Sequence, residues 1–270
     1  MASPNPIHLP SRFQIRQLTE RDVPHALAIT THANTFHSPI WAPTYPNDQA
    51  ARAYRLQQTA INFIAINVIS GLSYGVFDTE YKFKRPESAA TGGKLWWDSR
   101  NTDATGAELL EQMDFPLVSI AMAYDGAEPR DGSEWAPILE SVPAYAYLRA
   151  ELARGDKRDP DSWKPRGYGE VVRRGGTATR QDYAGFGLAK GMAHWHLWEM
   201  KGRGFSGYQI TTAHPGLSRV FLNPPAPFRA ELVSRAGIGE VEVEDGEEGV
   251  VRPFGKCEAF DCCLIWVDLR

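Results

Sequence analysis

The sequence predicts a mixed α/β fold in one enlarged domain, and three observations support that prediction. Residues 115–125 form a run that is apolar enough to lie in the centre of a sheet. Strand-like runs alternate with stretches whose apolar residues recur at helical spacing, which is the layout of α/β proteins. With 270 residues, of which 43% are hydrophobic and 23% charged, the chain is long enough to bury a sizeable core.

The first half of the chain begins with a segment, residues 1–11, that is rich in proline, serine and asparagine and is expected to be flexible. Thr19 is a typical N-cap because acidic residues follow it in the first helical turn, and Gly71 is a typical helix stop. Residues 79–106 mix charged, small and aromatic side chains and predict no defined element. The expected elements are, in chain order, a strand at 13–18, a helix at 19–30, a helix at 48–71, and strands at 72–78 and 115–125.

In the second half, the apolar content of residues 126–168 is too thin for a separate core, so this segment is predicted to be an insertion or lid of the single domain, residues 12–270. Gly202 and Gly204 end a later helix. An acidic stretch at 240–248 predicts a hairpin tip around Asp245 and Gly246. The expected elements are a helix at 141–154, a strand at 169–177, a helix at 187–201, a strand at 208–213, a short helix at 217–222, and strands at 229–234 and 260–269.

Composition and charge argue against several classes of function. The formal net charge of −4 disfavours a general nucleic-acid binder, because such a protein needs a basic surface to displace counterions. No apolar run is long enough to span a bilayer, and residues 1–10 lack the apolar core of a secretory signal, so a cytoplasmic protein is expected. The three cysteines cluster near the end and indicate no disulfide framework. His194 and His196 do not share a helix face, so no metal site is expected.

The segment from residue 179 to residue 190 lies between a predicted strand and a predicted helix. A turn that opens a helix leaves several backbone N–H groups without partners, and the helix dipole adds partial positive charge at the same end. Gly185 and Gly187 have no Cβ, so the backbone can approach a bound anion closely. The segment therefore predicts a binding site for an anion such as a pyrophosphate.

Residues 183–189, with the sequence Tyr-Ala-Gly-Phe-Gly-Leu-Ala, resemble the pyrophosphate loop of the GNAT superfamily, the acyl-CoA-dependent N-acyltransferases. The family pattern is Gln/Arg-x-x-Gly-x-Gly/Ala, and Gly187 and Ala189 match its last two fixed positions. The first strand with Thr19 after it, and residues 211–215, are also similar to the family. The resemblance assigns these residues to cofactor binding: Ala178, Thr179, Arg180, Ala184, Gly185, Phe186, Gly187, Leu188, Ala189 and Lys190.

The resemblance implies a mixed, mostly antiparallel sheet whose centre splays open around acetyl-CoA or another acyl-CoA, with helices on both faces. It implies transfer of an acetyl or small acyl group to an amine or hydroxyl of a small molecule. The chain also resembles enlarged GNAT-like proteins of filamentous fungi, which implies a setting in specialised metabolism. A dinucleotide site competes as an interpretation of the loop. It needs an acidic residue at the end of the next strand, where the chain has only Thr211 and Thr212.

Two positions depart from the family pattern. Ala184 stands where the family has Gln or Arg, and Phe221 stands where it often has a tyrosine that protonates the departing thiolate. Most pyrophosphate contacts come from the backbone, so the first departure weakens binding only modestly, whereas the second removes the usual general acid. Two alternatives stay open: a GNAT fold repurposed for chemistry without CoA, such as a cyclase, lyase or isomerase, or a non-catalytic acyl-CoA-binding module.

Acyl transfer to an amine needs a base for the amine, a proton donor for the thiolate and N–H groups for the oxyanion. Backbone N–H groups at residues 178–180 are expected to stabilise the oxyanion. Glu170 and Asp182 are the candidate bases, and His214 and Ser218 are placed to protonate the thiolate. Each of these side chains also has a simpler interpretation as a surface or turn residue. The aromatic residues expected to line a substrate pocket are Trp41, Tyr45 and Tyr74.

Overall fold

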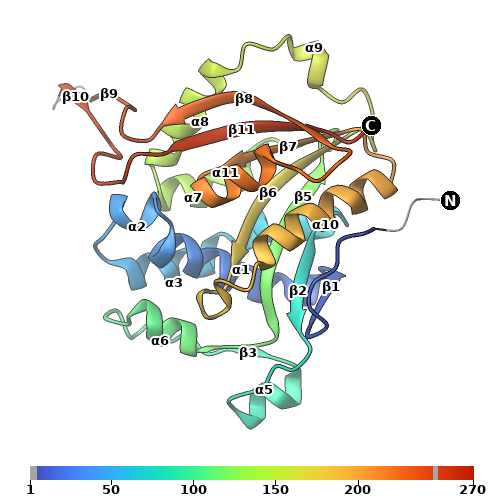
Figure 1. The fold of residues 1–270 in the computed structure, drawn as a ribbon. Helices are drawn as coiled ribbons and strands as arrows, with labels where there is room; N and C mark the ends of the chain where they lie inside the picture. The colour runs from blue at the N-terminus through green and yellow to red at the C-terminus, as the bar shows by residue number, and fades with distance from the viewer. Residues whose placement is uncertain (1–4, 246–248) are drawn as a thin grey trace.

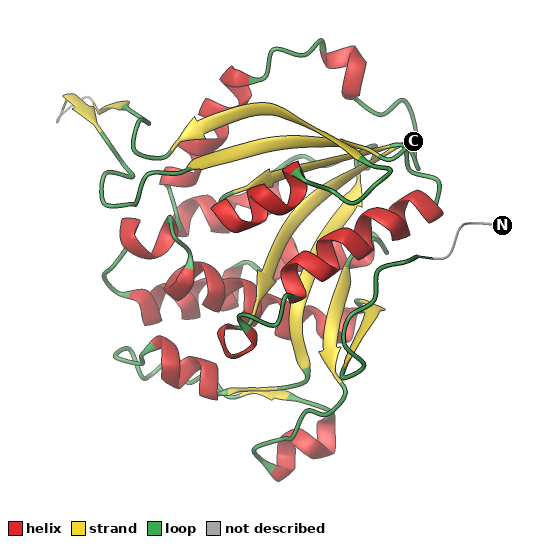
Figure 2. Ribbon diagram, viewed as in Figure 1, coloured by secondary structure: helices red, strands yellow, loops and turns green. Residues whose placement is uncertain are grey.

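A computed structural model describes residues 5–245 and 249–270, and its centre is one seven-stranded sheet (Figures 1 and 2). The strands lie in the order β1-β2-β5-β6-β7-β11-β8. Neighbouring strands are antiparallel except β6 and β7, which are parallel. This arrangement confirms the predicted mixed, mostly antiparallel sheet. The strands are β1 (Phe13–Gln17), β2 (Tyr74–Asp78), β5 (Leu117–Asp125), β6 (Val171–Thr179), β7 (Gly207–Thr212), β8 (Arg229–Gly237) and β11 (Asp261–Asp268).

Strand β5 shows how the sequence places the sheet between two layers. Eight of its nine residues are buried, which fits the apolar run predicted there. Successive side chains of a strand point to opposite faces, so the alternate residues of β5 contact different helices. Val118 and Ala121 join the core under helix α10 (Leu188–Gly202), while Ile120 and Met122 join the core under the helices of the opposite face.

Helices cover both faces of the sheet (Figure 1). On one face lie α10 and α11 (Pro215–Leu222), which bury Leu188, Met192 and Phe221 against strands β6, β7 and β11. On the other face lie α1 (Val23–His32) and α4 (Ile61–Ile69), whose buried residues pack on the opposite side of β5. The predicted placement of helices on both faces is therefore confirmed.

The N-terminal helix begins where the sequence predicts. Thr19 and Asp22 form a capping box, and a 3₁₀ turn, η1 (Glu20–Asp22), leads into α1. The chain then continues as a π-helix, η2 (Ala33–His37), and a short helix, α2 (Trp41–Thr44).

The prediction of a single helix between residues 48 and 71 is wrong. The structure has two helices there, α3 (Gln49–Thr59) and α4, because the backbone turns at Ala60, where φ is −92° and ψ is 14°. The turn lets α4, whose sequence is apolar around most of its circumference, enter the core while α3 keeps a polar face.

Residues 79–114, most of which predict no defined element, form a small substructure beside the sheet. Helix α5 (Pro86–Thr91) and helix α6 (Gly106–Glu111) flank a two-stranded sheet. That sheet pairs β3 (Lys94–Leu95) with β4 (Met113–Asp114).

The segment at 126–168 holds more helix than expected and packs onto the sheet. Its main helix, α8 (Ala144–Gly155), lies along β8, where Ser234 Oγ donates to the Leu152 carbonyl at 2.8 Å. Leu148 and Leu152 are buried with Ala236 of β8. The segment therefore supplies part of the core, and its role as a lid stays a prediction. Its other elements are η3 (Ser133–Trp135), α7 (Ala136–Ser141) and α9 (Pro160–Trp163).

At the chain ends, the predicted acidic hairpin is bounded by two paired strands, β9 (Val243–Asp245) and β10 (Gly249–Val251). Its tip at residues 246–248 lies outside the described residues, as do residues 1–4 of the segment expected to be flexible. From the rest of that segment, the Asn5 side chain donates to the Trp195 carbonyl of α10 at 2.8 Å. No helix in the described ranges is both long enough and apolar enough to cross a membrane.

Candidate active site

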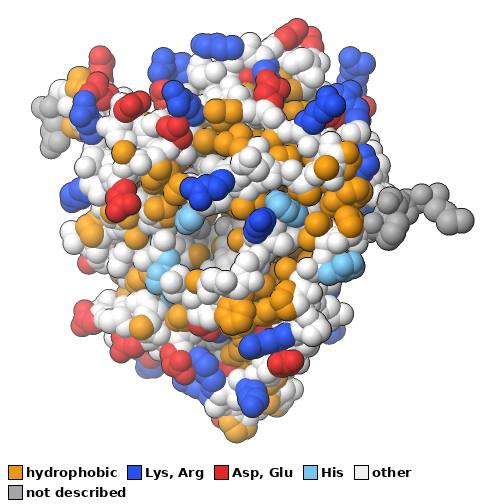
Figure 3. Space-filling model, in the orientation of Figure 1, with side chains coloured by type: hydrophobic (Ala, Val, Ile, Leu, Met, Phe, Trp, Pro, Cys, Tyr) orange, Lys and Arg blue, Asp and Glu red, His pale blue; other side chains and the backbone are white. Residues whose placement is uncertain are grey.

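Strands β6 and β7 separate partway along their length. Residues 171–173 of β6 pair with residues 207–209 of β7, and no further pair follows among the described residues, although β6 continues to Thr179 and β7 to Thr212. The strands are parallel, so their carboxyl ends lie at the same edge of the sheet, where α/β sheets bind ligands. We name the unpaired region the β6–β7 split. The face that carries α10 and α11 is hollowed near its centre, and histidine side chains lie around the hollow (Figure 3).

Strand β6 turns two backbone N–H groups toward the split. The amide of Arg180 donates to the Val118 carbonyl of β5 at 2.9 Å. Amides alternate between the two sides of a strand, so the Ala178 amide also faces β5, whereas those of Thr177 and Thr179 face the split. Of the three residues expected to stabilise an oxyanion, Thr179 alone turns its N–H that way, and Thr177 is not among the expected residues.

A β-bulge bends β6 next to these amides. The register with β5 shifts between Arg174 and Gly176, so Gly175 is an extra residue in the strand. A Cβ at Gly175 would overlap the side chain of Asn67 on α4, so only glycine fits there. The bulge therefore sets the direction of the neighbouring side chains, Arg174 among them.

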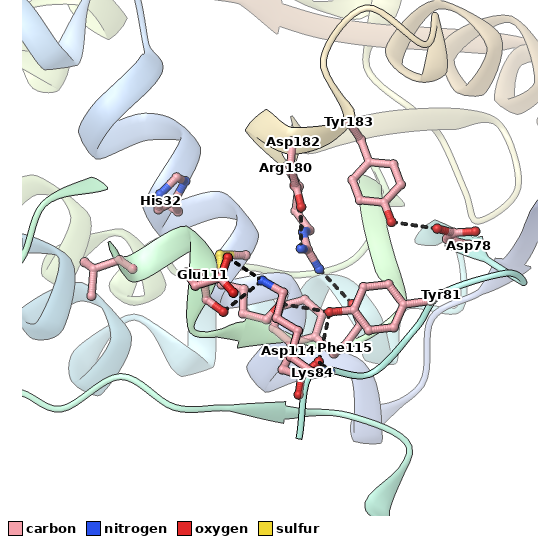
Figure 4. A network of polar contacts seen from close by, with 12 residues as sticks. His32, Asp78, Tyr81, Lys84, Glu111, Asp114, Phe115, Arg180, Asp182 and Tyr183 are labelled. Carbon is pink, nitrogen blue, oxygen red and sulfur yellow. Dashed lines mark hydrogen bonds and ion pairs between the residues drawn. The ribbon is translucent and has the colours of Figure 1, made fainter. Parts of the chain in front are cut away.

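The base of the loop after β6 is fixed to the first half of the sheet (Figure 4). The side chain of Arg180 is fully buried, and it pairs with Asp182 at 2.7 Å and donates to the Phe115 carbonyl at 2.7 Å. Although burial acts in the opposite direction, pairing with Asp182 raises the pKa of Arg180. Tyr183 donates its hydroxyl hydrogen to Asp78 Oδ2 at 2.6 Å.

The tip of the same loop is exposed and keeps its amides free. After the 3₁₀ turn η4 (Gln181–Tyr183), residues 184–187 are exposed, and Gly185 and Gly187 have φ values of 85° and 73°, which favour glycine. Within the described ranges, no group accepts a hydrogen bond from the amides of residues 185–190. Those at 188–190 open the 15-residue helix α10. A fixed base, an exposed tip and free amides at a helix N-terminus suit a phosphate-like anion.

The structure separates the two predicted bases. Glu170 precedes β6 at the end away from the loop, where its Oε2 accepts from the Arg166 amide at 2.8 Å. The nine residues of β6 put Glu170 about 30 Å from the loop. Asp182 lies at the loop, but both of its oxygens accept hydrogen bonds from Arg180, at 3.1 and 2.7 Å. Glu170 is thus not brought to the split, and Asp182 is engaged in fixing the loop.

His214 and Ser218 lie across the split from the loop, where α11 follows β7. His214 is the N-cap of α11, and its Nδ1 accepts from the Gly216 amide at 3.0 Å. Its side chain is exposed, and desolvation by its surroundings lowers the pKa of His214. Ser218 is buried, and its Oγ lies 2.7 Å from Thr212 Oγ1. Ser218 therefore ties α11 to β7, while His214 stands at the edge where a ligand can reach it.

A polar network that no sequence pattern predicts lies at the inner end of the split. Tyr208 of β7 places its hydroxyl 2.5 Å from Arg174 Nη1 and 2.9 Å from His196 Nδ1. His196 Nε2 lies 2.9 Å from the Leu72 carbonyl, which can only accept, so Nε2 carries the hydrogen and Nδ1 accepts from Tyr208. Burial lowers the pKa of His196 to about 3, which keeps the imidazole neutral. The one available signal was an arginine pair, Arg173 and Arg174, inside a predicted central strand.

The aromatic residues expected to line one pocket lie in two places. Trp41 packs edge-to-face on Tyr145 of α8 with ring centroids 5.5 Å apart, and Tyr45 accepts a hydrogen bond from the first residue of α8 at 2.8 Å. Tyr74 lies under α10 instead, where its hydroxyl donates to Glu199 at 3.0 Å. Trp41 and Tyr45 therefore both contact α8, whereas Tyr74 belongs to the core under α10.

Comparisons with known proteins identify the fold. No protein-family model and no curated protein sequence matches the chain. Among solved structures, the C-terminal condensation domain of Ebony in complex with β-alanyl-dopamine is similar, with 14% identity, 94% of this chain and 97% of that chain covered, and a TM-score of 0.58. Arylalkylamine N-acetyltransferase 2 from Aedes aegypti is similar with 10% identity, 96% of this chain and 100% of that chain covered, and a TM-score of 0.58. The chain therefore has a GNAT-like fold, as the glycine loop at residues 183–189 predicts.

Proposed function

We propose that the protein transfers an acetyl or another small acyl group from CoA to an amine of a small molecule. The observation that carries this proposal is the position of the loop at residues 184–190. Its free amides lie at the same sheet edge as the β6–β7 split. One site can thus bind a diphosphate and direct an extended chain attached to it along the unpaired edge of β6.

The residues of the site fit an acyl-CoA, which would supply the activated acyl group. The amides at 185–190 would hold the pyrophosphate, and Lys190, exposed in the first turn of α10, adds a cation. The unpaired edge of β6 offers N–H and C=O groups to the amides of the pantetheine arm, as a free strand edge does to a peptide. The amides of Thr177 and Thr179 face the position where a thioester carbonyl would lie and would stabilise an oxyanion there.

The amine is proposed to approach β6 from the face of the sheet that carries α1, opposite α10 and α11. The π-helix η2 contacts β6 there, and α2, which carries Trp41, contacts η2. Thr35 of η2 is 2% exposed, and its Oγ1 has no hydrogen-bond partner among the described residues. π-helices occur frequently at functional sites, and aromatic side chains favour a substrate with an aromatic ring. The arylalkylamine N-acetyltransferase and the domain solved with β-alanyl-dopamine support this substrate class.

A thiol-release assay tests the proposal. The protein is mixed with acetyl-CoA and each member of a panel of arylalkylamines and aliphatic amines, and free thiol is measured together with the N-acetylated amine. The expected result is one thiol released for each amine acylated, with arylalkylamines preferred. If acetyl-CoA binds but no amine of the panel causes release of the CoA thiol, acyl transfer is contradicted and a non-catalytic binding module is supported. The absence of the usual tyrosine at Phe221 favours that second candidate. The setting in specialised metabolism stays a prediction.

A further inference from the structure

Arg174 occupies the inner end of the β6–β7 split. It is the first residue of β6 after the last residue paired with β7, and its side chain is partly exposed. The guanidinium carbon lies 5.9 Å from the centre of the Phe221 ring of α11 and 5.8 Å from the Tyr208 ring of β7. Arg174 therefore lies on the face of the sheet that α10 and α11 cover, where the proposed acyl-CoA chain would end.

Neutral groups hold the guanidinium in place. Nε donates to the Met122 carbonyl at 2.8 Å, and Nη1 donates to Tyr208 at 2.5 Å. Nη2 donates to the Gly176 carbonyl at 3.1 Å and to Thr177 Oγ1 at 2.6 Å. An arginine has five N–H groups, so these four bonds fix its orientation and leave one N–H for another partner.

Arg174 has no acidic partner in the parts of the chain that the structure describes. No carboxylate there lies within 4.0 Å of its nitrogens, whereas Arg180, the other large cation of the site, is paired with Asp182. Burying a cation without a counter-charge costs free energy, and a bound anion would offset that cost. The bond to Thr177, whose amide faces the split, puts this cation beside the proposed oxyanion site.

Tyr208 cannot take the place of the missing tyrosine at position 221 as a proton donor. Its hydroxyl hydrogen is directed to His196 Nδ1, because His196 Nε2–H is directed to the Leu72 carbonyl. The hydroxyl is also fully buried, and burial raises the pKa of Tyr208. Arg174 is the charged group that remains at this end of the split.

We infer that Arg174 stabilises the CoA thiolate that leaves during acyl transfer, by charge rather than by donating a proton. The inference rests on the proposed function. In the transfer, the amine nitrogen forms a bond to the acyl carbon and the carbon–sulfur bond breaks. The electron pair of that bond moves to sulfur, whose negative charge faces the free N–H of Arg174, and the proton lost by the nitrogen goes to water. The positive charge of a guanidinium acts without proton transfer, so the stabilisation does not require a general acid.

The test compares the binding of CoA with that of desulfo-CoA, which lacks the thiol, by calorimetry at pH 7 and at pH 9.5. A free alkyl thiol ionises near pH 8.5, so the thiolate dominates only at the higher pH. If Arg174 lowers the pKa of the bound thiol by one unit, the affinity for CoA relative to desulfo-CoA rises about sevenfold between the two pH values. The titratable groups that face Arg174 are Tyr208, whose pKa burial raises, and His196, whose pKa burial lowers to about 3, so neither changes its charge between the two pH values. Desulfo-CoA corrects for groups that bind the rest of the cofactor.

Two variants separate charge from shape. Arg174→Met keeps an unbranched apolar stem and removes the guanidinium with its charge, so the rise in CoA affinity between the two pH values should disappear while desulfo-CoA binds as before. Arg174→Lys keeps the charge and should retain part of the rise. If CoA and desulfo-CoA bind the unmodified chain with the same pH dependence, the role of Arg174 is contradicted and the proposed function stands. If neither ligand binds, the proposed function fails and this inference fails with it. Thermal denaturation of both variants checks that they are folded.

Discussion

The side chains of Arg180 and Asp182, two residues apart, form an ion pair with Nη2 2.7 Å from Oδ2, and this pair fixes the base of the glycine loop. The arginine side chain is 0% exposed, whereas that of the aspartate is 37% exposed. We predict that Asp182→Ala lowers the free energy of unfolding by about 2 kcal/mol, less than for a fully buried pair because solvent screens the carboxylate.

Urea denaturation measures this loss, and the chain offers a matched control. Asp98 and Arg100 are also two residues apart and pair at 2.8 Å, but their side chains are 48% and 89% exposed. Asp98→Ala should therefore cost much less stability than Asp182→Ala. Equal losses in the two variants would mean that the loop does not depend on the buried pair.

Tyr183 provides a second anchor of the loop, through its bond to Asp78 at 2.6 Å. Tyr183→Phe removes this bond, so we predict a loss of about 1–2 kcal/mol in unfolding free energy and a several-fold weaker affinity for acetyl-CoA. Tyr54→Phe is the control, because Tyr54 of α3 donates to the Asn101 carbonyl at 3.0 Å outside the loop. It should change stability similarly and leave the affinity unaltered; a matching loss of affinity in both variants would show that the effect is not local to the loop.

Buried histidines should make the fold sensitive to acid. An unfolded histidine binds a proton near pH 6.5, whereas burial holds the pKa of His196 at about 3 and those of His25 and His32 at about 4. The unfolded state therefore binds more protons below pH 6.5, so the free energy of unfolding falls as pH drops from 6.5 toward 3. Each histidine contributes up to about 1.4 kcal/mol per pH unit.

Urea midpoints measured between pH 7 and pH 4.5 test this dependence. His196→Gln removes one titrating group and should reduce the slope of unfolding free energy against pH. An unchanged slope in His196→Gln would mean that His196 takes up its proton at the same pH in the folded and unfolded states.

The position of Ser218 in the sequence makes it a candidate proton donor, whereas its buried contact with Thr212 predicts a structural role. Ser218→Ala should lower the free energy of unfolding by about 1 kcal/mol and leave kcat for amine acetylation within twofold. The measurement is kcat across pH 6–9 together with urea denaturation. A fall in kcat of a hundredfold or more without loss of stability would restore Ser218 as a proton donor.

The parts of the fold that the sequence predicts are those with a local signal. The apolar run of β5, the Thr19 cap and the glycine loop each depend on neighbours in the chain, and the structure has each at the predicted place. The break at Ala60 was not predictable, because it follows from how α4 enters a core assembled from distant segments.

The candidate site was predictable only where backbone atoms form it. The loop depends on glycines and a helix start, which the sequence displays. The contact of Arg174 with Tyr208 joins residues 34 apart, and that of His196 with Leu72 joins residues 124 apart. Side chains that look equivalent in the sequence also separate in space: Trp41 packs on α8, whereas Tyr74 packs under α10. Such pairings follow from the topology of the sheet and not from spacing along the chain.

The most direct test of the account is a calorimetric titration with acetyl-CoA of the unmodified chain and of two glycine variants. Gly187 and Gly204 lie just outside the two ends of α10, with φ values of 73° and 96°, and a Cβ at either would meet no atom within 4 Å. Valine at either position imposes a similar backbone strain. We predict saturable binding to the unmodified chain and to Gly204→Val, and none to Gly187→Val. No binding of millimolar acetyl-CoA to the unmodified chain, or equal binding to all three proteins, would contradict an acyl-CoA site at this loop.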